Sequence, residues 1–272
     1  MSGGATHVRR AAPGSGYRRF CTAGEDLADL TFGTCSLEEG QAWEGVSGDE
    51  EVLAVIVRGR VDASAGDRSW SAVGGRASVF DGRASAVYVP PHNGIRLRAA
   101  GGPALVGLCQ APVRPDQACP APYAIGPEEV RVASRGRAPF LREVHDILDA
   151  TRPAARLVVG ETFNAVGNWS SYPPHKHDEN RPEVEVRLEE LYYFQFAPEA
   201  GFGAQFLYTA DGDLDEAHRV RQGDVTLLPR GYHPVAAAPG YRLYYLWVMA
   251  GDGRQLRPFD DPTHAWVKSA QA

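Results

Sequence analysis

Apolar and polar residues form short runs along most of the chain, each bounded by turn-forming residues. Segments rich in Val, Ile, Leu and Tyr are separated by Gly, Pro and Asp clusters, a pattern typical of β-strands. Thirty glycines and twenty prolines supply many turns. Because short strands joined by such turns favour a sandwich or barrel, the pattern predicts an all-β protein. Strand segments are expected at 52–64, 85–91, 95–99, 104–111, 155–163, 188–196, 202–210, 225–229 and 241–250.

One segment near the centre of the chain, FLREVHDILD at 140–149, is predicted to form a short helix. The two sides of this segment share an order: an acidic residue opens an apolar strand, a second strand ends in proline, and a third returns after a turn. This weak duplication predicts two β domains, joined by a proline-rich connector. The expected organisation is a mobile tail at 1–15, an N-terminal barrel at 16–125 and a C-terminal barrel at 126–272.

Charge and apolar content argue against two classes of partner. The formal net charge of −6 argues against a nucleic-acid binder, which usually has a basic face. No apolar run approaches the roughly 20 residues that span a bilayer, and the first residues lack the apolar core of a secretory signal. The four cysteines lack metal-ligand spacing. Reduced thiols in a cytoplasmic protein are expected, although the sequence also allows a Cys109–Cys119 disulfide.

The spacing of three histidines in the second half of the chain suggests a metal site. The stretch SSYPPHKHD places His175 and His177 two residues apart, directly after a double proline. On a strand, such a pair points to the same face. The stretch GDVTLLPRGYHP supplies His233, and an acid from LEELYYF would complete a set of three imidazoles and one carboxylate. That set suits Zn²⁺, Mn²⁺, Fe²⁺ or Ni²⁺. The alternative is that these are ordinary surface or core histidines satisfied by hydrogen bonds.

The order HxH, Glu and G-D-x4-P-x-G-x-H resembles the two motifs of cupins, small jelly-roll barrels that hold a metal. The wording GNWSSYPPHKHD, LEELYYFQF, GDVTLLPRGYHPV, APGYRLYYL and VMAG closely resembles the 5-deoxy-glucuronate isomerases of bacterial myo-inositol catabolism. This resemblance runs from Phe20 to Trp266 and is strongest over 160–251. The related 4-deoxy-5-ketouronate isomerases share the histidines and the glutamate, but not the SSYPPHKHD wording.

The resemblance implies a bicupin: two jelly-roll β-barrels with a short helical segment between them. It implies one divalent metal in the C-terminal barrel and no organic cofactor. The N-terminal half has no HxH pair, only an isolated His92 near the matching position, and is expected to be a degenerate cupin barrel. The ligands implied for the metal are His175, His177, Glu190 and His233.

The residues alone do not decide which glutamate joins the histidines. Strand parity does not choose between Glu189 and Glu190, because both faces of a barrel strand can be buried. Alignment with the cupin pattern selects Glu190. The twelve residues 178–189 between the histidines and this glutamate exceed the spacing of most cupins and are expected to include a loop at the barrel mouth.

The reaction that the resemblance implies is the aldose–ketose isomerisation of 5-deoxy-D-glucuronate to 5-dehydro-2-deoxy-D-gluconate. A metal would polarise the carbonyl, and a base would move a proton between neighbouring carbons. A homo-oligomer is expected by analogy. The alternatives are a cupin dioxygenase and a non-enzymatic sugar-acid-binding cupin. Candidates are Tyr192, Glu161 and Gln205 for proton handling, and Arg142, Arg230 and Arg242 for the substrate carboxylate.

Overall fold

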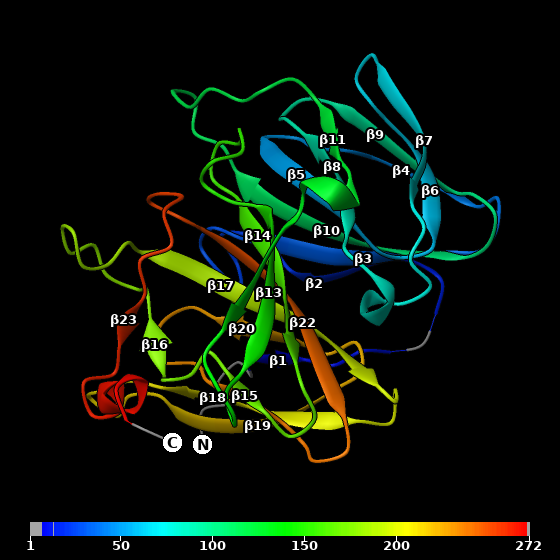
Figure 1. Cartoon of the computed structure of the whole chain (residues 1–272). Coiled ribbons are helices and arrows are strands. Elements are labelled where there is room, and N and C mark those ends of the chain that lie inside the picture. The colour runs from blue at the N-terminus through cyan, green and yellow to red at the C-terminus, as the bar shows by residue number, and fades with distance from the viewer. Residues whose placement is uncertain (1–6, 13, 271–272) are drawn as a thin grey trace, which may run out of the picture.

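The computed structural model describes residues 7–12 and 14–270, and these residues form two stacked β-barrels (Figure 1). The prediction of an all-β bicupin is confirmed. Within the described ranges there is no α-helix, and no helix is long and apolar enough to cross a membrane. Three short 3-10 helices occur, η1 (Val79–Asp81), η2 (Pro127–Glu129) and η3 (Ala265–Lys268).

The N-terminal barrel consists of a six-stranded sheet, in the order β11-β8-β5-β10-β3-β2, and a four-stranded sheet, in the order β4-β9-β6-β7. Buried Val, Leu, Ile and Ala side chains form a core cluster between these sheets. The strands are β2 (Gly16–Cys21), β3 (Thr31–Leu37), β4 (Ala42–Val46), β5 (Glu50–Arg58), β6 (Arg60–Ala65), β7 (Arg68–Gly74), β8 (Ser85–Val89), β9 (Gly94–Ala99), β10 (Ala104–Pro112) and β11 (Tyr123–Ile125).

The C-terminal barrel has a seven-stranded sheet, in the order β1-β20-β17-β22-β14-β13-β12, and a four-stranded sheet, in the order β15-β21-β18-β19. A two-stranded ribbon, β16-β23, lies beside them. The strands are β1 (Val8–Arg9), β12 (Arg131–Arg135), β13 (Arg142–Leu148), β14 (Val158–Asn164), β15 (Trp169–Ser170), β16 (His175–Lys176), β17 (Leu188–Ala197), β18 (Phe202–Tyr208), β19 (Asp215–Arg221), β20 (Val225–Leu228), β21 (Val235–Ala237), β22 (Arg242–Gly251) and β23 (Phe259–Asp260).

The helix expected at 140–149 is wrong, because this segment contains strand β13. Its backbone pairs with β12 on one side and with β14 on the other. A ten-residue helix is marginal by itself, since nucleation is costly. In the strand, alternate side chains serve two faces. Arg142 and Val144 line a cavity, whereas His145 lies close to Glu161 on the opposite face.

Part of the tail expected at 1–15 is held against the C-terminal barrel. Val8 and Arg9 form β1, which pairs antiparallel with β20 of the C-terminal barrel. Val8 is buried, and Arg10 forms an ion pair with Asp224. Burial and pairing therefore hold the start of the chain against an edge that would otherwise be open. Residues 1–6 and 13 lie outside the described residues, and the division at 125/126 stays a prediction.

The two barrels share a continuous apolar core. Phe20 and Phe32 of the N-terminal barrel contact the ring of Tyr193, with centroid distances of 6.5 and 5.8 Å. Leu191 and Leu246 belong to the same buried cluster. Strands β14, β17 and β22 are therefore buried on both faces, one against the other barrel and one inside their own barrel. This explains their long apolar runs.

A buried ion pair crosses this shared core. Arg76 Nη2 lies 2.5 Å from Glu161 Oε1, and Arg76 Nη1 lies 3.1 Å from Glu161 Oε2. The Tyr244 hydroxyl also donates to Glu161, at 2.8 Å. Glu161 is fully buried between the barrels. Glu161, named above as a candidate for proton handling, therefore pairs with Arg76 and does not line the cavity of the C-terminal barrel.

We predict that Glu161→Ala lowers the free energy of unfolding by about 3–5 kcal/mol, because it leaves the Arg76 guanidinium buried without an opposite charge. Denaturant unfolding measures the change. Glu44→Ala is the matched control, since Glu44 pairs with Arg96 at the exposed surface, where an ion pair contributes at most about 1 kcal/mol. Equal effects of the two changes would contradict this account of the inter-barrel pair.

Candidate metal centre

Three histidine side chains converge inside the C-terminal barrel. His175 and His177 come from the segment of β16, and His233 follows the turn after β20. Each offers a ring nitrogen, and the three nitrogens all lie within 4.8 Å of one another. His177 and His233 are buried. The HxH pair and the later histidine are thus brought together as the sequence predicts.

Glu190 completes the cluster from β17. Its Oε2 lies 3.1 Å from His177 Nε2 and 3.2 Å from His233 Nε2. The neighbouring Glu189 points to the other face, where it accepts a hydrogen bond from the Asp29 N–H at 2.8 Å. Parity on β17 therefore places Glu190, and not Glu189, with the histidines.

Backbone carbonyls orient two of the imidazoles. His177 Nδ1 lies 2.9 Å from the Leu188 carbonyl oxygen, and His233 Nδ1 lies 2.9 Å from that of Gly231. An Nδ1–H that donates to a carbonyl leaves Nε2 as the free lone pair, as in many histidine metal ligands. His233 Nε2 is buried without a hydrogen-bond partner among the described residues. A bound cation would satisfy this atom.

The electrostatics also suit a cation. Burial, reinforced by the neighbouring His233 and His177, lowers the pKa of His175 well below its usual range. Burial acts to raise the pKa of Glu190, but the adjacent His177 and His233 side chains outweigh it and hold this pKa at about 2. A neutral imidazole and an ionised carboxylate are the forms that bind divalent metals. The residues present fit the predicted ligand set.

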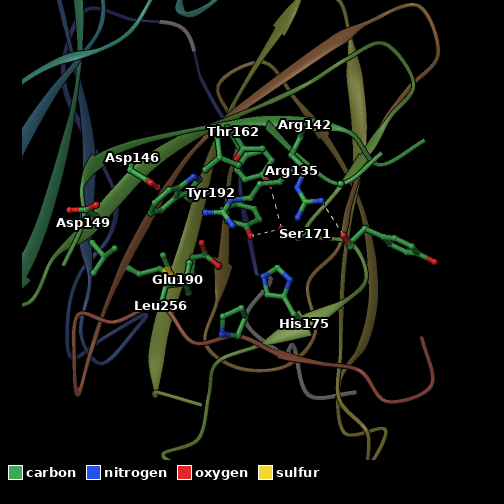
Figure 2. A pocket seen from close by; sticks show the side chains of 18 of the residues that line it. Arg135, Arg142, Asp146, Asp149, Thr162, Ser171, His175, Glu190, Tyr192 and Leu256 are labelled. Atoms are coloured by element: carbon green, nitrogen blue, oxygen red, sulfur yellow. Dashed lines mark hydrogen bonds between the residues drawn. The ribbon is translucent and has the colours of Figure 1, made fainter. Parts of the chain in front are cut away.

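A cavity of about 780 Å³ opens beside His175 and Glu190. Figure 2 shows these side chains facing the same space as Tyr192 and Ser171. The volume falls within the usual range for small-molecule sites. Apolar side chains contribute part of the wall, among them Val144, Trp247, Met249 and Leu256.

Hydroxyl groups form a connected cluster at this cavity. Ser171 Oγ lies 2.9 Å from the Tyr192 hydroxyl and 3.4 Å from the Tyr245 hydroxyl, and the Tyr245 hydroxyl donates to Ser170 at 3.0 Å. Burial raises the pKa of both phenols, so they stay protonated at neutral pH. Sequence reasoning named Tyr192 but missed Ser171 and Tyr245. Side chains alternate along β22, so placing one inward-facing residue of this strand would have identified Tyr245 as another.

Only one of the three predicted arginines reaches the cavity. Arg142 lines it, and its Nη1 donates to the Phe140 and Tyr172 carbonyls, both at 3.2 Å. Arg230 instead faces Asp213 at the exposed surface, 3.4 Å away. The guanidinium of Arg242 lies over the Phe80 ring, 4.5 Å from its centroid. Neither of these two is among the residues that line the cavity.

Arg135, which sequence reasoning missed, is a second cation at this wall. It lies directly opposite Arg142 in the β12–β13 ladder and also lines the cavity. Like charges placed opposite each other repel. Burial, with a further contribution from Arg135, lowers the pKa of Arg142. An anion bound between these guanidinium groups would relieve the repulsion.

The other residues considered in the sequence analysis do not line the cavity. The Gln205 side-chain amide donates to the His233 carbonyl at 2.9 Å, so it supports the backbone of a candidate ligand. His92 is an exposed turn residue in the N-terminal barrel. Cys109 and Cys119 are free, as are the other two cysteines, which agrees with the expectation of reduced thiols.

The described residues form two β-barrels and contain a single cluster of three histidines and a glutamate. These features define a cupin-type protein with two barrels. An IolB-like protein from Salmonella typhimurium LT2 superposes with a TM-score of 0.92, at 34% identity over 97% of this chain and 99% of the other. An oxalate decarboxylase from Lactobacillus farciminis shares the fold at 13% identity, with a TM-score of 0.64 over 94% and 86% of the two chains.

The chain belongs to the KduI/IolB family, whose sequence model matches residues 21–267. A relative from Geobacillus thermodenitrificans NG80-2, named 5-deoxy-glucuronate isomerase, is 40% identical over 88% of this chain and 86% of its own. A relative of the same name from Bacillus subtilis 168 is 35% identical over 90% of each chain. The resemblance seen in the sequence is therefore confirmed.

We predict that His233→Ala and Glu190→Gln each weaken metal binding more than about 100-fold, since even the loss of an outer partner typically costs 10–100-fold. Elemental analysis of the purified proteins measures metal content. His92→Ala serves as the control and retains the wild-type content. Full metal occupancy in the His233→Ala protein would remove His233 from the ligand set.

Proposed function

We propose that this chain is a metal-dependent 5-deoxy-glucuronate isomerase, converting 5-deoxy-D-glucuronate to 5-dehydro-2-deoxy-D-gluconate in myo-inositol catabolism. The observation that carries the proposal is the buried cluster of three histidines and Glu190 beside a cavity whose wall includes Arg142 and Arg135. The names of relatives with 35–41% identity over most of their length support it.

One divalent metal, of the set Zn²⁺, Mn²⁺, Fe²⁺ and Ni²⁺, is proposed to bind to the imidazole and carboxylate groups of the cluster. When bound, such an ion supplies Lewis-acid polarisation of the substrate carbonyl. The cluster is reached from the cavity through His175 and Glu190, which both line the cavity. The proposed ligands are His175, His177, Glu190 and His233.

Arg142 and Arg135 are proposed to bind the substrate carboxylate. Arginine presents N–H groups in a geometry that matches a carboxylate. Within the described ranges, no acidic side chain lies within ion-pair distance of Arg142, so this cation is available to an anion from the cavity. Binding there would orient the sugar acid with its other end toward His175 and Glu190.

The isomerisation moves one hydrogen from the hydroxyl-bearing carbon to the aldehyde carbon, and one hydroxyl proton between the two oxygens. Tyr192 is the candidate for the proton on oxygen. Its hydroxyl is buried, protonated and hydrogen-bonded to Ser171, so it can donate to a substrate oxygen and recover a proton through its neighbour. Glu161 and Gln205 do not line the cavity and have no part in this proposal.

We predict that metal-replete protein converts 5-deoxy-glucuronate to the ketose, as followed by proton NMR, and that His233→Ala protein does not. In D₂O, an exchanging base would place solvent deuterium on the new carbon-bound position of the product. Complete retention of the substrate hydrogen would instead favour a direct hydride shift or a shielded base. Substrate left unchanged by metal-replete wild type would defeat the proposal, and oxygen consumption would favour a dioxygenase.

We predict that Arg142→Met lowers kcat/KM about 10- to 100-fold, because hydrogen bonds to charged groups contribute roughly 1.5–3 kcal/mol. Steady-state kinetics on 5-deoxy-glucuronate measure the change, with the metal content checked alongside. Arg96→Met is the matched control, since Arg96 is exposed on the N-terminal barrel. Unchanged kcat/KM in the Arg142→Met protein would contradict the carboxylate assignment.

A further inference from the structure

The segment 178–187 between β16 and β17, here called the insertion, is anchored by a buried lysine. Lys176 lies between His175 and His177 in sequence and is largely buried. Its Nζ lies 2.7 Å from Glu179 and 3.0 Å from Glu185, and it also forms an ion pair with Asp178. A cation held by three carboxylates fixes the insertion to the strand that carries the histidine pair.

Glu185 closes the insertion around this lysine. Its side chain is fully buried, and its Oε1 accepts the backbone N–H of Asp178 at 2.8 Å and that of Glu179 at 3.1 Å. The oxygens of these three acids lie close enough to hold a metal ion. However, the Lys176 ammonium already contacts all three, and Arg181 pairs with Glu179 and Glu185, so the protein's own cations occupy this cluster.

Asp178 connects this cluster to the turn before His233. Its Oδ2 accepts the Gly231 N–H at 2.7 Å, and the Gly231 carbonyl accepts from His233 Nδ1 at 2.9 Å. Gly231 has a φ of +90°, and a Cβ there would lie 2.6 Å from the Tyr208 carbonyl oxygen. The turn is therefore specific to glycine, and a single carboxylate joins the two chain segments that carry the histidines.

We propose that Asp178 is a positioning residue for the metal centre. Held in place by Lys176 and Glu185, it fixes the Gly231 peptide and, through that peptide, the imidazole of His233 relative to the histidine pair. This inference rests on the proposed metal site. The insertion thus acts as an outer support of the ligand geometry.

A comparison of Asp178→Ala with Asp178→Asn separates position from charge. Both variants lose the negative charge, but only asparagine keeps an oxygen that can accept the Gly231 N–H. Metal-free proteins are titrated with Mn²⁺, and the free ion is followed by electron paramagnetic resonance. The alanine variant is expected to bind Mn²⁺ about 10- to 100-fold more weakly than wild type, and the asparagine variant is expected to recover most of this loss. Glu183→Ala, at an exposed position of the same insertion, is the control and retains wild-type affinity.

Equal Mn²⁺ affinities of the alanine and asparagine variants would overturn the positioning role, because charge alone would then explain any change. If the alanine variant does not fold, Asp178→Ser replaces it, since the shorter serine hydroxyl does not reach Gly231. Wild-type protein that binds no Mn²⁺ would count against the proposed metal site itself, so the two failures are distinguishable.

Discussion

The structure depends on three strands, β14, β17 and β22, that are buried on both faces. One face packs against the N-terminal barrel, and the other forms the interior that holds Glu190 and Tyr245. Because most side chains on these strands are buried, the charged ones among them need partners. Glu161 has Arg76 on one face, and Glu190 has two histidines on the other. The same burial that stabilises the two barrels therefore also keeps Glu190 beside the histidines of the site.

The N-terminal barrel contributes to the site without entering it. Its own interior is filled with small and branched apolar side chains. Its outer face packs against β17, the strand that presents Glu190. Phe20 and Phe32 make this contact through the ring of Tyr193. Asp29 anchors Glu189 from the same side. A rigid backing of this kind holds a metal ligand in place more firmly than a solvated sheet face would.

Local patterns predicted the parts of the molecule that obey a simple period. The HxH pair, His233 and most strands could be found in this way, because strand alternation and turn residues are local properties. Parity could not choose between Glu189 and Glu190, since both faces of β17 are buried. Arg135 was missed, and a helix was wrongly predicted at 140–149 where β13 lies, because both depend on pairing with the neighbouring strands.

The pairing of β1 with β20 means that the two barrels are not separable at the connector between them. A fragment beginning at residue 126 would lack β1 and would expose Leu191, Leu246 and Val248 on one sheet face. Each such side chain contributes about 1.5–3 kcal/mol when buried, so a few of them match the whole stability of a typical domain. The C-terminal barrel alone would therefore need another apolar surface to cover this sheet face.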